Sequence, residues 1–214
     1  MDVAIVEHQA DAHAGLIADW AGERGLETGV VRVHAGDPWP DADAVGRAVV
    51  LGSDQSVLER PPWLEGELDW LRRLDGAARA VLGVCFGAQA LSAALGGTVA
   101  KAMRPEIGWF QIDGSQPVGG TWFQWHSDAF TAPPGARELG RNASGLQSYR
   151  LRRHLAIQFH PEVTPAIVDG WISVGGRELA EQALDADEIR ARTDREAARA
   201  REAAYALFDA WAAG

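Results

Sequence analysis

The chain has 214 residues, of which 47% are apolar and 23% are charged, and its formal net charge is −10. This length fits a single domain with one substantial core, and the composition is ordinary for a globular protein. An acidic chain is a poor match for nucleic acid or an anionic membrane, because both attract clustered positive charge. Cys85 is the only cysteine, so the fold cannot depend on an internal disulfide.

The N-terminal segment and the apolar runs indicate where the protein resides. Residues 1–6 carry neither the basic region nor the longer apolar region of a signal peptide. No uninterrupted apolar run approaches the ~20 residues that a membrane helix needs. We therefore expect a cytoplasmic protein.

The first half of the chain alternates apolar strands with amphipathic helices. The expected strands are residues 3–6, 30–33, 45–51 and 80–84. The expected helices are residues 11–23, a segment opened by Pro61 and Pro62, and residues 88–95. This alternation predicts an α/β fold of three layers, with a mostly parallel central sheet and helices on both faces.

The second half predicts antiparallel additions to that sheet, followed by helices. Short β-like segments are expected at residues 107–112, 122–125 and 146–151, and a last buried strand at residues 155–159. A helix should begin at Thr164 or Pro165 and end near Val174, where two glycines follow. We accordingly divide the chain into one domain at residues 1–174 and a C-terminal helical extension at residues 175–214, packed on the same domain.

The strongest chemical signal surrounds Cys85, in a Gly-x-Cys-x-Gly pattern between a predicted strand and a predicted helix. The same arrangement with serine is the nucleophile elbow of α/β hydrolases. The sharp turn exposes the side chain at the carboxyl edge of the strand, and the helix N-terminus favours a thiolate. The alternative is a buried, inert cysteine, the usual state of a lone one. The flanking Gly83 and Gly87 favour the nucleophile.

A second signal lies at the end of the last predicted strand, where His160 and Glu162 stand two residues apart. Residues at this spacing share one face of an extended chain, so Glu162 can orient the imidazole while His160 takes a proton from the thiol. No function is assigned to the remaining histidines outside the 125–128 segment, which have no such setting: His8, His13, His34 and His154.

Together, residues 83–89 and 159–163 resemble the motifs of the class I glutamine amidotransferase family, in the order and at the spacing that this family uses. The resemblance implies a flavodoxin-like three-layer fold and a cysteine-dependent glutamine amidohydrolase. In such an enzyme Cys85 attacks the side-chain amide of glutamine, releases ammonia and forms a γ-glutamyl thioester. His160 is then the base and Glu162 its orienting acid.

The resemblance also implies an oxyanion hole formed by the backbone N–H groups of Gly52, Ser53 and Phe86. The family's loop often reads Gly-Gly-Pro, whereas this chain has Gly52-Ser53-Asp54. Ser53 needs only its backbone N–H for this role, but a serine is strained if the second glycine normally adopts a positive φ. Asp54 adds a negative charge near the developing oxyanion unless its side chain points away.

Further substrate contacts follow from the same resemblance. Gln89 corresponds to the glutamine of the nucleophile motif that helps to hold the substrate. Residues Trp125, His126, Ser127 and Asp128 resemble the segment whose main chain binds the α-amino and α-carboxylate end of the substrate. The alternative for Trp125 and His126 is aromatic packing in the core.

Residues 104–109 resemble a subgroup of stand-alone family members, similar to the amidotransferase domain of GMP synthetase and to γ-glutamyl peptidases. Glu106 and Trp109 are expected either to shape the mouth of the pocket or to cap a strand and fill the core. The two interpretations stay open on sequence grounds.

The destination of the ammonia is also open. A synthetase domain would not fit in 214 residues, and the chain has no phosphate-binding Gly-x-x-x-x-Gly-Lys loop. Ammonia would then pass to a separate synthetase or be released, and no cofactor or metal is expected. One alternative is a γ-glutamyl peptidase or hydrolase, which uses the same thioester chemistry. Another is a non-catalytic or redox-sensing protein on this fold. The oligomeric state is not indicated.

Overall fold

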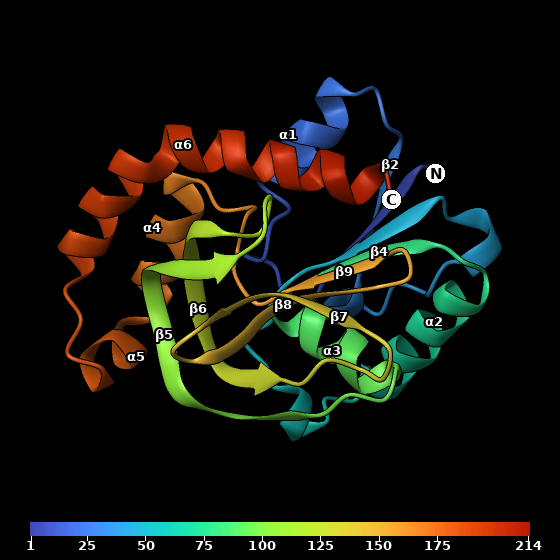
Figure 1. The fold of residues 1–214 in the computed structure, drawn as a ribbon, viewed down its shortest axis with the longest axis horizontal. Helices are drawn as coiled ribbons and strands as arrows, with labels where there is room; N and C mark the ends of the chain where they lie inside the picture. Colours follow the sequence, from blue (N-terminus) through green and yellow to red (C-terminus); the bar gives the residue numbers. More distant parts are fainter.

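Five parallel strands form one half of a nine-stranded sheet in the computed structural model, which describes residues 1–214 (Figure 1). In spatial order they are β2 (Thr28–Arg32), β1 (Val3–Glu7), β3 (Arg47–Val50), β4 (Ala80–Val84) and β9 (His154–Ile157). Every residue of β4 and β9 is buried, as expected for strands covered on both faces. The predicted strands at residues 3–6 and 80–84 are present.

The register of these strands brings three loops to one edge of the sheet. Val50 of β3 pairs with Gly83 of β4, and Val84 pairs with Ile157 of β9. The segments that follow β3, β4 and β9 therefore leave the sheet side by side at its carboxyl edge, the usual position for a ligand site in a parallel sheet. This edge holds Cys85.

Four antiparallel strands complete the sheet beyond β9. They are, in order, β8 (Gly145–Leu151), β7 (Arg137–Asn142), β5 (Val99–Gly114) and β6 (Gly120–Phe130). The α/β fold with antiparallel additions is confirmed, but β5 and β6 are much longer than the predicted segments. The sequence does not predict β7, because the residues of this strand are mostly polar and show no apolar alternation.

Helices cover both faces of the sheet (Figure 1). Helices α2 (Leu64–Gly76) and α3 (Phe86–Ala94) contribute to one apolar core, whereas α1 (Leu16–Glu23) and α6 (Ala186–Ala212) contribute to the core on the opposite face. Helices α4 (Pro165–Val174) and α5 (Gly176–Glu181) flank β6. Short 3₁₀ turns lie at Val33–Ala35, Ala42–Ala44 and Val57–Glu59. No helix combines the length and apolarity needed to cross a membrane.

Two helices begin elsewhere than predicted, for local reasons. Helix α1 was expected from residue 11 but begins at Leu16, because Gly15 has φ 46 and breaks the helical course. The N–H of Leu16 donates to the carbonyl of Glu162, at 2.9 Å. Helix α3 begins at Phe86, directly after Cys85 and two residues earlier than expected.

The last turns of α6 are fixed to α1 by aromatic and ionic contacts. Trp211 is fully buried, with its ring centroid 6.2 Å from that of Trp20. Arg24 forms two hydrogen bonds of 2.7 Å with the carboxylate of Asp209, and Trp20 Nε1 donates to the same carboxylate. Since the ion pair is exposed, most of the stabilisation comes from the buried rings.

We expect Trp211→Ala to lower the free energy of unfolding by about 3–5 kcal/mol, the usual cost of truncating a fully buried Trp. Met103→Ala is the control, because Met103 is 94% exposed and its truncation should change stability by less than about 0.5 kcal/mol. Urea unfolding measures both. Equal effects of the two substitutions would show that the end of α6 does not stabilise the body.

Candidate active site

Cys85 occupies the turn between β4 and α3 in a strained conformation, with φ 52 and ψ −108. Two glycines allow this turn to lie close to its neighbours. A Cβ added at Gly83 would lie 2.6 Å from the carbonyl oxygen of Gly87, and one added at Gly87 would lie 2.1 Å from that of Val50. Both distances are too short for a side chain, which explains the Gly-x-Cys-x-Gly pattern.

His160 and Glu162 lie beside this turn and are both buried. His160 Nδ1 is 2.7 Å from Glu162 Oε1, and the imidazole packs edge-on against Trp171. The backbone N–H of His160 donates to the carbonyl of Phe123, which fixes the segment against β6. With Nδ1 directed to the carboxylate, Nε2 has no hydrogen-bond partner and remains for the sulfur of Cys85.

The pKa of His160 is raised to about 10. Burial favours the neutral ring, but the negative charges of Glu162 and then of Cys85 outweigh it and stabilise the imidazolium. An imidazolium beside sulfur in turn favours the thiolate form of a cysteine. The geometry is therefore compatible with an imidazolium–thiolate pair at neutral pH.

The loop after β3 places the predicted oxyanion donors next to these side chains. A Cβ at Gly52 would lie 3.1 Å from His160 Cε1 and 3.7 Å from Cys85 Cβ, so a glycine leaves room for the imidazole. The backbone N–H groups of Ser53 and Phe86 have no protein acceptor. Ser53 does not have a positive φ, so the strain considered for a serine at this position does not arise.

Two consecutive residues after β1 hold this loop. His8 Nδ1 is 3.0 Å from the carbonyl oxygen of Gly52, and Gln9 Oε1 accepts the backbone N–H of Asp54 at 2.6 Å. The Asp54 side chain itself is exposed. No sequence motif marks His8, although its position just after a buried parallel strand predicts the same edge of the sheet as Cys85.

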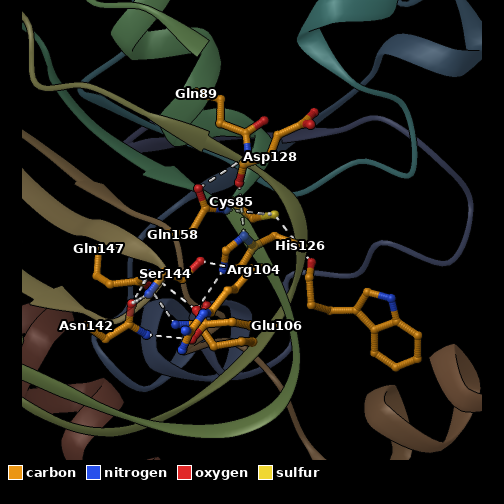
Figure 2. A network of polar contacts seen from close by, with 12 residues as sticks. Cys85, Gln89, Arg104, Glu106, His126, Asp128, Asn142, Ser144, Gln147 and Gln158 are labelled. Atoms are coloured by element: carbon orange, nitrogen blue, oxygen red, sulfur yellow. Dashed lines mark hydrogen bonds and ion pairs between the residues drawn. The ribbon is translucent and has the colours of Figure 1, made fainter. Parts of the chain in front are cut away.

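A series of buried amides leads to the sulfur of Cys85 (Figure 2). Gln158 Nε2 donates to Cys85 Sγ at 3.5 Å, while Gln158 Oε1 accepts from Gln89 Nε2 at 3.3 Å. Gln89 Nε2 also donates to the carbonyl of Asp128 at 3.5 Å. The carbonyl of Asp128 can only accept, so Gln89 must direct its amide nitrogen toward it. The same nitrogen then faces the amide oxygen of Gln158, and this leaves an N–H of Gln158 facing the sulfur. Gln158 is not predicted from the sequence as a part of this site.

His126 lies in the same network, between Asp128 and Glu106 (Figure 2). Its Nδ1 is 2.9 Å from the carbonyl oxygen of Asp128, and its Nε2 is 3.1 Å from Glu106 Oε2. Glu106 also accepts hydrogen bonds from Asn142 and Gln147. The His126 ring is thus buried among polar partners, and a contact of its main chain with substrate stays a prediction.

The rest of the 125–128 segment borders the site. The carbonyl oxygen of Trp125 is 3.7 Å from Cys85 Sγ, and Trp125 Nε1 donates to Glu178 of α5 at 2.6 Å. Asp128 accepts a hydrogen bond from Ser56 Oγ and forms an ion pair with Lys101, whose Nζ is 2.8 Å away. Ser127 is exposed. Of this segment, the carbonyl of Trp125 lies beside the sulfur, and the binding of substrate by its main chain stays a prediction.

Glu106 and Trp109, for which two interpretations were open, both lie away from the pocket. Glu106 of β5 is buried and pairs with His126 of β6, and Trp109 is 5% exposed with its Nε1 donating to Thr193 of α6 at 2.9 Å. Neither residue lines the cavity that contains Cys85. The core interpretation holds for both.

The cavity at this edge of the sheet has a volume of about 720 Å³. Among its lining residues Cys85 and His160 are buried, whereas Lys101 and Glu178 are exposed. Most of the charged residues that line it are acidic. No group of three or more His, Cys, Asp or Glu side chains is arranged to hold a metal ion.

The chain is similar to known proteins over much of its length. The family model described as glutamine amidotransferase class-I matches residues 11–170. The glutamine amidotransferase-like protein YfeJ of Salmonella typhimurium is 34% identical over 118 residues, which cover 52% of this chain and 49% of that protein. The glutamine-hydrolysing GMP synthase of Aeropyrum pernix is 30% identical over 190 residues, 77% of this chain but 34% of that protein. The chain thus matches about half of the first relative and a third of the second.

Solved structures match along nearly the whole chain. A glutamine amidotransferase from Methylobacillus flagellatus superposes with a TM-score of 0.92 at 25% identity, covering 98% of this chain and 93% of that one. A glutamine amidotransferase from Thermotoga maritima gives a TM-score of 0.90 at 21% identity, covering 99% and 97%. Because the family model covers most of the chain, the protein belongs to the class I glutamine amidotransferase family.

Proposed function

We propose that this protein hydrolyses the side-chain amide of glutamine, with Cys85 as nucleophile, His160 as acid and base, and Glu162 as the orienting carboxylate. The observation that carries the proposal is the meeting of these three side chains in one cavity beside unpaired backbone N–H groups. Membership of the family supports it as well. Nucleophile, base, orienting acid and oxyanion donors are the parts that acyl transfer requires.

In the first half of the reaction, the thiolate of Cys85 attacks the side-chain carbonyl carbon of glutamine. The carbonyl oxygen becomes an oxyanion, and the N–H groups of Ser53 and Phe86, together with that of Gly52, are placed to stabilise it. As the C–N bond breaks, the imidazolium of His160 donates its proton to the departing nitrogen. Ammonia leaves and a γ-glutamyl thioester remains on Cys85.

In the second half, water attacks the thioester carbonyl and neutral His160 accepts a proton from it. The C–S bond breaks, glutamate leaves, and the imidazolium–thiolate pair is restored. The hydrogen bond between His160 Nδ1 and Glu162 keeps Nε2 directed at the reacting atoms in both halves.

The ammonia is proposed to pass to a separate synthetase or to be released. The name of one relative links glutamine hydrolysis to GMP synthesis, and this chain matches only 34% of that protein. This partial match is consistent with a separate partner that carries out the reaction that uses the ammonia.

A γ-glutamyl peptidase or hydrolase is the second candidate, and the size of the cavity favours it. The space of about 720 Å³ continues from Cys85 outward to α5, which leaves room for a leaving group larger than ammonia. The thioester chemistry would be the same, so the two candidates differ only in what the outer cavity accepts.

The first test compares the wild type with Cys85→Ala. We expect the wild type to release glutamate and ammonia from glutamine, and Cys85→Ala to release neither, because no nucleophile remains. Met103→Ala, at an exposed residue that does not line the cavity, should retain full activity. Coupled glutamate dehydrogenase and direct ammonia assays measure the products.

A γ-glutamyl dipeptide assayed beside glutamine separates the candidates. Faster Cys85-dependent turnover of the dipeptide would assign the protein to γ-glutamyl hydrolysis. An absence of turnover of both substrates by the folded wild type would contradict the proposal and point to a non-catalytic or redox-sensing role.

Glu162→Gln should lower kcat/KM by roughly 10²-fold, because an amide orients the imidazole without stabilising its charge, within the range found for acid–base groups. Steady-state kinetics near pH 7.5 measure this effect, with circular dichroism to confirm folding. An unchanged kcat/KM would remove Glu162 from the proposed machinery.

Stability should also depend on pH through His160. Its pKa is about 10 in the fold against an ordinary value of 6.5, so the stabilisation is complete below pH 6.5 and is lost as the pH rises toward 10. Glu162→Gln removes the largest cause of the raised pKa, so its free energy of unfolding should fall less over this range. Urea unfolding at pH 6, 8 and 10 measures the difference, and parallel slopes would contradict the assignment.

A further inference from the structure

A buried ionisable pair, His8 and Glu67, lies directly behind the loop that follows β3. His8 follows β1 and is 4% exposed, while Glu67 lies in α2 and is fully buried. His8 Nδ1 is 3.0 Å from the carbonyl oxygen of Gly52, and His8 Nε2 is 3.0 Å from Glu67 Oε2. The proposed hydrolysis makes no direct use of either side chain.

The partners of the His8 ring determine which nitrogen carries a proton. The carbonyl of Gly52 can only accept, so Nδ1 must be the donor. Nε2 shares a second proton with the carboxylate of Glu67, whose other oxygen has no partner. Burying such a pair usually costs stability relative to apolar side chains. Costly features of this kind are expected where they serve a function.

The hydrogen bond to Gly52 fixes the peptide group that carries the N–H of Ser53. The Gly52–Ser53 peptide is trans, so its C=O and N–H point in opposite directions. Because the oxygen faces His8, the N–H faces away from it. This N–H has no protein acceptor, and Gly52 and Ser53 line the cavity beside Cys85.

The next peptide is held as well, by the residue after His8. Gln9 accepts the N–H of Asp54 at 2.6 Å, so the two peptide groups on either side of Ser53 are each bound by a side chain that follows β1. The His8 ring also packs against Phe86, with ring centroids 4.8 Å apart. The His8 imidazole therefore packs against Phe86 and also binds the peptide group that carries the N–H of Ser53.

We propose that His8, supported by Glu67, is a positioning residue that holds the N–H of Ser53 toward the oxyanion formed at Cys85. Donors fixed before the reaction stabilise a developing charge without reorganising, which makes them effective. This role rests on the proposed acyl-transfer function, but it applies to any acyl donor that Cys85 attacks.

Two substitutions separate the two ring nitrogens. In His8→Asn the side-chain amide nitrogen can take the place of Nδ1 and keep the hydrogen bond to Gly52, while the contact with Glu67 is lost. In His8→Gln the amide can reach Glu67 in place of Nε2, while the hydrogen bond to Gly52 is lost. A purely structural role for the buried pair predicts that His8→Asn is the more harmful change, whereas the positioning role predicts the opposite.

Two reactions of Cys85 supply the readout. Acylation by p-nitrophenyl acetate passes through a tetrahedral oxyanion: the thiolate bonds to the acetyl carbon, and p-nitrophenolate leaves in a measurable burst. Alkylation by iodoacetamide displaces iodide at a saturated carbon and forms no oxyanion. Since Cys85 is the only cysteine, Cys85→Ala gives the blank for both.

We expect His8→Gln to slow acylation by roughly 10- to 100-fold, somewhat less than the ~10²–10³ lost with a whole oxyanion donor. Its alkylation rate should match the wild type, and His8→Asn should recover most of the acylation rate. His154→Asn is the matched control, because it removes another buried histidine–carboxylate contact, 2.8 Å from Asp75, at the opposite end of β9. It should leave both rates unchanged.

The proposal is overturned if His8→Gln acylates like the wild type, if its alkylation falls in parallel, or if His8→Asn is the slower of the two. A wild type without a Cys85-dependent burst would overturn it as well. If His8→Gln does not fold, Glu67→Gln takes its place and should slow acylation by a smaller factor, again with normal alkylation; equal acylation would count against the role. A wild type that shows the burst but turns over neither glutamine nor the γ-glutamyl dipeptide contradicts the proposed function alone.

Discussion

The site depends on one strained turn at Cys85, which is stable only because the neighbouring strands bind it. A positive φ at a non-glycine residue costs of order 1–3 kcal/mol, so the turn persists only where surrounding contacts impose it. The N–H of Cys85 donates to Ile157 of β9 at 2.8 Å, and the N–H of Gly87 donates to Leu51 after β3 at 3.2 Å. The strands on either side of β4 thus clamp the turn. The same two strands deliver the oxyanion loop and His160.

Strand order explains why residues so distant in sequence meet. Strands β1, β3, β4 and β9 are consecutive neighbours in the sheet, and all run in the same direction. Each is followed at the carboxyl edge by one part of the site: His8, Gly52, Cys85 and His160. The helices on the two faces bury the strands from which these residues project, so the constellation sits on a rigid support. The antiparallel half adds β6, whose Trp125 lines the cavity with its carbonyl beside the sulfur.

Local patterns were enough to predict part of the site but not the network around it. Five consecutive residues predict the turn at Cys85. The two-residue period of an extended chain is enough to predict that His160 and Glu162 share one face. Continuous apolar runs, which are also local patterns, predict the parallel half of the sheet. In contrast, His8 meets Glu67 59 residues away, and Gln158 meets Cys85 73 residues away. Such pairs leave no local signal. Strand β7 escaped prediction because its stability comes from its neighbours rather than from its own apolar residues.

The position of Lys101, which pairs with Asp128 at the cavity, has a chemical consequence outside the proposed reaction. Lys101 is the only lysine and Cys85 the only cysteine of the chain, and both line the same cavity. An amine-selective and a thiol-selective reagent would therefore each find a single side chain, and both side chains lie at one site. The only other amine in the sequence shown is the α-amino group of Met1, so the native sequence already provides two orthogonal attachment points for spectroscopic probes across its own cavity.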